Sequence, residues 1–348
     1  IELGGSVSTS GAVSLSAVSG SILDGDIDAG IDVQASALRL SAGGGIGESG
    51  NAIETAVDTI SARAASSGIS ILENDGLTVD DTLSTVNRVT QDGTTGTESD
   101  LVQQDLVTLS GEGSIEIRLA AGDLVLNDGS AETDGLAVLA NGSGTILLEA
   151  LAGSITSFGD VNSGSGNIRI VAFDSVSFGP DTDGVTSGAA TIDLEAAEGA
   201  ILLAPDSTLI TGSGDVSLMA VDTVKIGEAV ITTGSAHITS VNGSIATDPL
   251  TGGGLVANES VVLSAAQGIG RSGGGTLSIE SSALSLENSE MGSVYLELVG
   301  SLSLSSLTMT DSGSLYLRQT EGDLTVSETI RLEASKAVLE TGGVFTME

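Results

Sequence analysis

The sequence predicts an all-β fold in which short strands wind into a solenoid, that is, a stack of similar coils. Three observations predict it: an apolar phrase recurs, its copies are almost evenly spaced, and side chains within it alternate in character. The phrase is an apolar residue, any residue, an apolar residue, any residue and Ala, with another apolar residue four or five positions later. The first residues of its clearest copies are Ile146, Ile168, Ile192, Val216, Ala236 and Val261. Successive copies are thus roughly 20–25 residues apart, a period typical of solenoids.

Weaker copies of the phrase lie on both sides of this central region. They begin at Val13, Ile31, Leu277, Val294, Leu315 and Ile330. We therefore expect a single β-solenoid over residues 1–348, with about 16 coils of roughly 20–24 residues each. The first residue is Ile rather than Met, and we interpret the chain as an excerpt of a longer one.

The alternation within the phrase separates an inner face from an outer face. Successive side chains of a strand point to opposite sides, so Ile146, Leu148 and Ala150 share one side and Leu147 and Glu149 share the other. The first side is apolar in every copy. The second side holds residues as different as Arg, Asp, Ser, His and Tyr. We expect the first set to fill the bore of the solenoid and the second set to face solvent.

One region interrupts the pattern. Residues 80–105 are the most polar part of the chain and include the run Gln91–Glu98. This composition predicts a long lateral loop or disturbed coils near 80–105.

Composition agrees with a narrow bore. Only 2% of the residues are aromatic and there is no Trp, so stacked aliphatic side chains have to fill the interior. The chain has 49 Gly and 3 Pro, which suits many tight corners and few interruptions of strand pairing. There are no cysteines, which excludes disulfides.

The charge balance excludes several classes of partner. The chain has 47 acidic and 10 basic residues, for a net charge of −37. Nucleic-acid binding needs clustered Lys and Arg, so we expect no nucleic-acid partner. No apolar run approaches the roughly 20 residues that cross a bilayer as a helix. We therefore expect no membrane insertion, and we find no signal peptide.

Several coils contain short recurring phrases, namely Gly122–Leu126, Gly322–Val326, Gly153–Ile155, Gly243–Ile245 and the Gly-rich segment 42–55. These phrases resemble the repeat region of filamentous-haemagglutinin-like bacterial proteins. The resemblance covers most of the chain and implies a right-handed parallel β-helix. It also implies export by a bacterium and a place in the extracellular space or on the bacterial cell surface.

Candidate sites are few. Asp24, Asp26 and Asp28 place carboxylates at alternate positions, as calcium loops do, and Asp181 and Asp183 form a shorter candidate. The competing interpretation is that the alternating Asp residues form the solvent-exposed face of a strand. No cofactor is required by the sequence, and calcium is the candidate. We expect no catalytic residues, because the single His237 lies at an outward position and no Cys accompanies it.

Two functional classes remain, with a third as a minor alternative. The first is the rod or stalk region of a large adhesin-like surface protein, which would hold a binding tip away from the cell. The second is a subunit of a self-assembling extracellular filament, sheath or matrix. The minor alternative is a polysaccharide-active enzyme. Neither terminal segment, 1–5 or 344–348, resembles a capping helix, so we expect further coils or neighbouring copies as partners. A host or matrix ligand would be an additional partner, and the sequence does not identify it.

Overall fold

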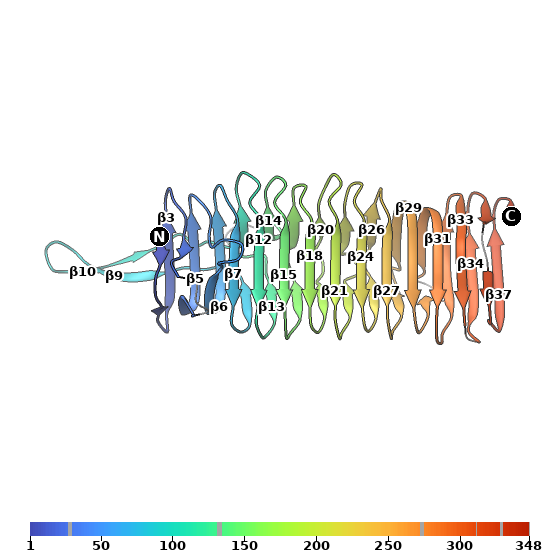
Figure 1. The fold of residues 1–348 in the computed structure, drawn as a ribbon, viewed down its shortest axis with the longest axis horizontal. Coiled ribbons are helices and arrows are strands. Elements are labelled where there is room, and N and C mark those ends of the chain that lie inside the picture. The colour runs from blue at the N-terminus through green and yellow to red at the C-terminus, as the bar shows by residue number, and fades with distance from the viewer. Residues whose placement is uncertain (27–29, 131–133, 272–274, 311, 328–329, 348) are drawn as a thin grey trace. The chain divides into compact units, whose positions relative to one another are not determined.

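The structure, a computed structural model, describes residues 1–26, 30–130, 134–271, 275–310, 312–327 and 330–347. Within these ranges the regular secondary structure is entirely β-strand, with no helix (Figure 1). The Cα positions group into two compact units, residues 1–167 and 168–348. We describe each unit by itself.

The amino-terminal unit contains strands of two to twelve residues. They are β1 (Glu2–Leu3), β2 (Val7–Ser8), β3 (Ala12–Ala17), β4 (Leu23–Asp24), β5 (Val33–Ala42), β6 (Ile53–Ala64), β7 (Ile69–Glu73), β8 (Leu77–Val79), β9 (Thr85–Val89), β10 (Thr95–Ser99), β11 (Leu106–Thr108), β12 (Ile115–Leu119), β13 (Leu124–Leu126), β14 (Leu136–Ala140), β15 (Ile146–Ala150), β16 (Ile155–Ser157) and β17 (Asp160–Ser163).

The carboxy-terminal unit has the same character, with strands of two to thirteen residues. They are β18 (Ile168–Ala172), β19 (Val176–Phe178), β20 (Gly184–Val185), β21 (Ile192–Ala196), β22 (Ile201–Leu203), β23 (Thr208–Ile210), β24 (Val216–Ala220), β25 (Val224–Ile226), β26 (Ala229–Thr232), β27 (Ala236–Ser240), β28 (Ile245–Thr247), β29 (Gly253–Ala265), β30 (Ile269–Gly270), β31 (Leu277–Asn288), β32 (Val294–Val299), β33 (Leu302–Met309), β34 (Ser314–Gln319), β35 (Leu324–Val326), β36 (Ile330–Leu332), β37 (Lys336–Thr341) and β38 (Phe345–Met347).

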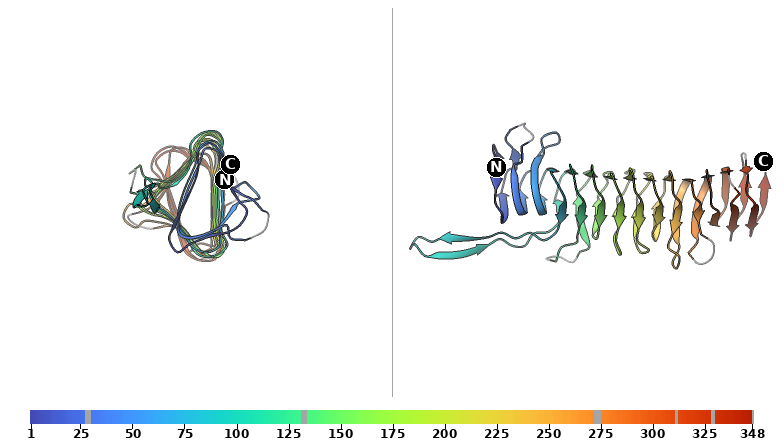
Figure 2. Two further views of the ribbon diagram at one scale, coloured as in Figure 1. Left: turned by 90° about the vertical axis from the view of Figure 1, so that its left-hand side faces the viewer. Right: turned by 90° about the horizontal axis from the view of Figure 1, so that it is seen from below.

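Parallel pairing between successive turns builds both units. In the carboxy-terminal unit, β21, β22 and β23 pair in parallel with β24, β25 and β26, so one turn of three strands lies on the next. Ile192 is opposite Val216, the first residue of the next copy of the phrase, and Val216 is opposite Ala236, the first residue of the copy after that. In the amino-terminal unit Val13 is likewise opposite Leu38 of the following coil. The predicted β-solenoid of parallel coils is confirmed, and the end-on view in Figure 2 shows the three-sided outline of the coils.

The predicted inner and outer faces are also confirmed. Ile192, Leu194 and Ala196 of β21 are at most 2% exposed, whereas the intervening Asp193 and Glu195 are partly exposed. Outward charges pair between coils: Arg169 contacts Asp193 and lies 2.8 Å from the Glu195 carboxylate. The aliphatic ladder inside each unit is therefore separated from its charged exterior by strand alternation alone.

Polar residues also enter the bore, and Thr232 and Asn288 do so where a strand turns into a corner. The Thr232 hydroxyl donates to the carbonyl of Gly212 at 3.2 Å and accepts from the Gly234 amide at 2.8 Å. The Asn288 side chain accepts from the Gly268 amide at 2.8 Å and donates to the Met291 carbonyl at 3.1 Å. These side chains form hydrogen bonds with backbone atoms that have no partner in the strands. Their burial therefore avoids the free-energy cost of burying an unpaired polar group.

Gly47 and Gly270 show why corners of these coils need glycine. Gly47 and Gly270 have φ angles of 62° and 70°. A Cβ atom on Gly47 would lie 2.2 Å from the Ser70 carbonyl oxygen, and one on Gly270 would lie 2.0 Å from that of Tyr295. Both glycines follow an Ile in the repeated Gly-Ile-Gly phrase. The phrase therefore marks a corner where the backbone adopts a left-handed conformation and lies against the backbone of the next coil.

The polar segment 80–105 contains an antiparallel hairpin. Strands β9 and β10 pair with Thr95 opposite Val89, and almost all of their residues are exposed. Figure 1 shows the hairpin projecting from the coils. At its base the Gln103 side chain donates to the Leu40 carbonyl at 2.8 Å and to the Ser61 hydroxyl at 3.0 Å. The hairpin is inserted within a turn and lengthens it. The strand-pairing partner of Ile69 on the next coil is therefore Ile115, about two coil periods further along the chain.

The alternation predicts effects of very different size for the same substitution on neighbouring strands. Leu194 is fully buried and Leu202 of β22 is 40% exposed. Leu194→Asp should lower the free energy of unfolding by several kcal/mol, because an unpaired carboxylate would enter the bore. Leu202→Asp should change it by less than about 1 kcal/mol. Denaturation followed by circular dichroism measures both, and equal stability of the two variants would contradict the arrangement of the core.

Candidate functional site

Three carboxylates meet near the start of the amino-terminal unit. Asp24 ends β4, Asp32 immediately precedes β5, and Glu54 is the second residue of β6. One oxygen from each side chain lies within 4.8 Å of the other two. Asp24 is 8% exposed and Asp32 is 4% exposed, so two of the three members of this acidic cluster are buried.

The pairing of coils brings these residues together. Val33 is opposite Thr55, which places Asp32 beside Glu54 of the following coil. The Asp32 amide donates to the Glu54 carbonyl at 2.9 Å, and the Glu54 amide donates to the Asp32 carboxylate at 3.1 Å. Asp24 is the last residue of β4. The Asn51 side chain holds the residues directly after it by donating to the carbonyl of Asp26 at 3.1 Å.

The cluster is electrostatically unfavourable as three bare carboxylates. Burial, together with a hydrogen bond to Asp32 and repulsion from Asp32 and Asp24, raises the pKa of Glu54 to about 7. Burial also raises the pKa of Asp32, with repulsion from Asp24 and Asp26 added and the hydrogen bond from the Glu54 amide opposing them. One oxygen of Asp24 accepts from the Asp26 amide at 3.1 Å. Its other oxygen, Oδ2, is buried and has no hydrogen-bond partner.

The candidate residues named from the sequence have different positions. Asp24 belongs to the acidic cluster and Asp26 lies beside it, close enough to raise the pKa of Asp32. Asp28 lies outside the described residues. Asp181 is exposed with a φ of 53°, and the Asp183 carboxylate accepts from the Thr208 amide of the next coil at 2.8 Å. The second pair is thus part of a corner, and the described residues place no third acidic ligand with it.

Sequence reasoning did not select Asp32 and Glu54 as site residues. Asp32 lies in the same Asp-rich segment as Asp24, but Glu54 lies well beyond that segment. The separation between Asp32 and Glu54 equals one turn, since Leu38 is opposite Ile60 in the same pair of strands. The coil period is therefore the sequence signal that could have predicted the contact between Asp32 and Glu54.

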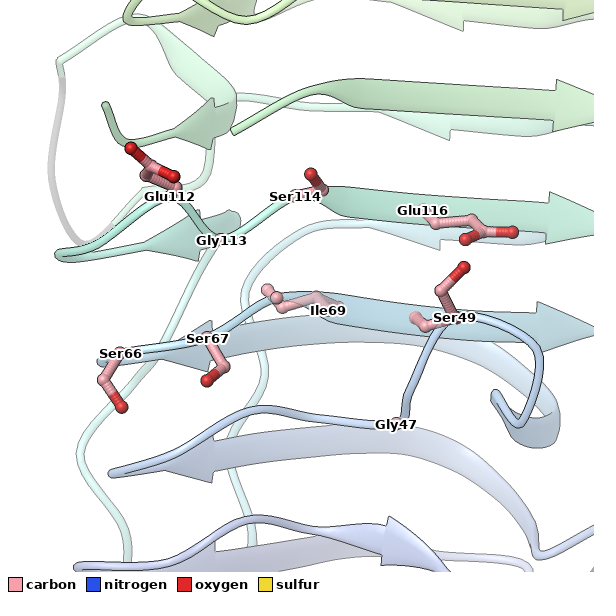
Figure 3. Close-up of a pocket in the computed structure, with 11 residues that line it drawn as sticks. Gly47, Ser49, Ser66, Ser67, Ile69, Glu112, Gly113, Ser114 and Glu116 are labelled. Atoms are coloured by element: carbon pink, nitrogen blue, oxygen red, sulfur yellow. The ribbon is translucent and has the colours of Figure 1, made fainter. Parts of the chain in front are cut away.

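An open groove with two further carboxylates lies nearby in the same unit. It has a volume of about 430 Å³ and is lined mainly by serines and glycines together with Ile69, Glu112 and Glu116. Figure 3 shows Glu112 and Glu116 on the coil that carries β12, above Ser66 and Ser67 of the preceding coil. Glu116 is not a free acid, because Arg118 lies 3.1 Å from it. No aromatic or basic side chain lines the groove, so it lacks the groups that stack against sugars or bind their carboxylates.

A stacked pair of tyrosines marks the outer face of the carboxy-terminal unit. Tyr295 and Tyr316 are opposite each other on β32 and β34, with ring centroids 4.7 Å apart and planes 9° apart. The Lys336 ammonium lies 5.0 Å from the Tyr316 ring centroid and donates to its hydroxyl at 3.2 Å. The pair is a coil-to-coil contact, and contacts of this kind stabilise by about 0.5–1.5 kcal/mol.

Asp105 is a buried carboxyl group that belongs to the scaffold. It is 2% exposed, has a φ of 65°, and its Oδ1 has no hydrogen-bond partner. Burial raises its pKa to about 7, with a hydrogen bond to Gln104 opposing, repulsion from Asp134 and Asp128 adding, and the positive charge of Arg63 opposing. Because solvent and ligands cannot reach it, we assign it no part in binding.

Comparison with protein-family models, curated proteins and solved structures found no match to this chain. Among the residues that the structure describes, there is also no helix with the length and apolar character that crossing a bilayer requires.

Asp105 should make the protein less stable as the pH rises. The carboxyl group has an ordinary pKa of 3.8 and a folded pKa of about 7, so the folded chain holds a proton that the unfolded chain releases between these values. Its contribution to stability is therefore greatest below pH 3.8 and falls until about pH 7. Asn accepts the left-handed backbone, and Asp105→Asn should raise the melting temperature at pH 8 more than at pH 4.5. An equal change at both values would contradict the assignment.

Proposed function

We propose that this chain is the stalk region of a large adhesin-like protein at a bacterial surface. The observation that carries the proposal is the ladder of in-register parallel coils, in which each turn packs on the turns before and after it. A scaffold of this kind extends surface in one direction and needs no reaction chamber. In each unit the bore is filled by aliphatic side chains.

The extracellular location is supported by sequence features. The coil phrases resemble those of filamentous-haemagglutinin-like bacterial proteins, which are exported. The net charge of −37 opposes association between exposed sheet edges and favours a chain that stays dispersed while it folds outside the cell. The hairpin β9–β10 adds exposed surface on which a ligand could dock.

One observation favours the second candidate, a subunit of a self-assembling filament. The residue after each strand-ending Ala or Ser is apolar on several successive coils of the carboxy-terminal unit. Phe173 is 46% exposed and Val241 is 52% exposed. The amides of Ala197, Val221 and Val241 donate to the carbonyls of Ala172, Ala196 and Ala220, so these residues form one row. Such a row could be covered by a neighbouring copy.

Electron micrographs of native material distinguish the two candidates. A stalk gives single fibres that end in a distinct tip, and Phe173→Glu leaves them unchanged. A filament subunit gives ordered lateral arrays, and Phe173→Glu disperses them because the row loses its apolar character.

The structural proposal predicts the absence of catalysis. Purified protein incubated with neutral and acidic polysaccharides, with and without calcium, should release no reducing ends above the level of a heat-denatured control. The groove that holds Glu112 and Glu116 is one place where a carboxylate pair could act, and the groove that holds Glu297 and Glu340 is another. Turnover that is lost in Glu112→Gln or Glu116→Gln would overturn the proposal in favour of a polysaccharide-active enzyme.

A further inference from the structure

We propose that Asp24, Asp32 and Glu54 form a binding site for one Ca²⁺ ion near the start of the amino-terminal unit. The site would add a ligand to a scaffold whose proposed role does not require one. Its presence or absence is therefore independent of the stalk proposal.

The geometry of the three carboxylates fits a single hard cation. Oxygen ligands lie about 2.4 Å from a bound Ca²⁺, so two oxygens on the same ion are at most about 4.8 Å apart. One oxygen from each of Asp24, Asp32 and Glu54 meets this limit, since all three lie within 4.8 Å of one another.

The burial of Asp24 distinguishes this cluster from an ordinary acidic surface. Asp24 is 8% exposed, and its Oδ2 has neither a solvent contact nor a hydrogen-bond partner. A carboxylate oxygen that is buried without a hydrogen-bond partner is unfavourable. A cation bound by the Asp24 carboxylate would offset the charge that burial leaves without a partner.

The described side chains offer this cluster no positive charge of their own. The ion pairs of the described residues involve Arg88, Arg118, Arg169, Lys225 and Arg331, and none of them includes a member of the cluster. The competing explanation is a proton held between Glu54 and Asp32. That explanation leaves the buried oxygen of Asp24 unpaired, whereas a cation satisfies all three side chains.

The donor set favours Ca²⁺ over other divalent ions. The three ligands are all carboxylates, with no His or Cys, which argues against zinc. Mg²⁺ demands a near-ideal octahedron and gives up water reluctantly, whereas Ca²⁺ accepts irregular sets of six to eight oxygens. Water molecules would complete the coordination shell on the exposed side of Glu54.

A bound ion would join consecutive turns. Asp24 and Asp32 flank the loop between β4 and β5, and Glu54 lies on β6 of the following turn. The backbone already links these turns through the Asp32 amide and the Glu54 carbonyl. Ca²⁺ would therefore stabilise the folded form of this part of the unit, because the unfolded chain does not hold the three carboxylates together.

Glu54→Gln provides the sharpest test. At pH 8, above the pKa of Glu54, and in the absence of divalent ions this variant should melt at a higher temperature than wild type, because one of three mutually repelling charges has been removed. It should also lose the calcium response. Asp58→Asn is the matched control: Asp58 is an exposed carboxylate on the same strand, and its removal changes the net charge equally.

The measurement is the melting temperature and the heat of binding on titration with CaCl₂ up to about 10 mM at constant ionic strength, with MgCl₂ in parallel. We expect an apparent Kd of roughly 0.1–1 mM, as in extracellular calcium modules. The melting temperature should rise by a few degrees in wild type and Asp58→Asn, and should stay unchanged in Glu54→Gln. Absence of a rise in wild type would overturn the proposal. An equal rise with Mg²⁺, or in Glu54→Gln, would overturn it as well, because general screening of a highly negative chain would then explain the effect.

Discussion

In-register parallel pairing between successive coils is the constraint on which the rest of this structure depends. It stacks Leu194 on Leu218 and Leu218 on Ile238, so each turn adds one aliphatic side chain to the same column inside the bore. The same pairing stacks outward residues, which brings Arg169 to Asp193 and Tyr295 to Tyr316. It also carries Asp32 to Glu54, and thereby creates the acidic cluster. Packing, surface charge and the candidate site thus have a common origin in coil register.

The regular coils could be predicted from the sequence because inside and outside are encoded by two-residue alternation. Ile146, Leu148 and Ala150 carry that signal without reference to any distant residue. The long interval between Ile69 and its partner Ile115 could not be predicted in the same way. Its insertion contains a hairpin whose own pairing, Thr95 with Val89, is local and independent of the coil period. The sequence predicts a lateral loop or disturbed coils near 80–105, but it does not predict the two paired strands.

The candidate site shows the same division. Asp24 stood out because carboxylates alternate in its segment, but its ligand partners are defined by coil register rather than by spacing within a loop. Glu54 looks like any outward residue of a strand until Val33 is placed opposite Thr55. Asp181 and Asp183 show the converse: the spacing is similar, yet Asp183 is used to hold the Thr208 amide of the next coil. Spacing alone therefore does not separate a ligand from a corner residue.

The central claim is that residues about one coil apart in sequence lie one strand apart in space. Because the chain has no cysteine, spin labels can be placed on cysteines introduced in pairs at Asp193, Ser217, His237 and Val262, which are outward and opposite one another on consecutive coils. Electron paramagnetic resonance should show a separation that grows by about 4.8 Å per coil from the first pair, Asp193 with Ser217, to the last, Asp193 with Val262. Dipolar broadening should be strongest for the first pair and weaken in that order. No broadening for Asp193 with Ser217, or separations that do not follow the coil order, would contradict the account.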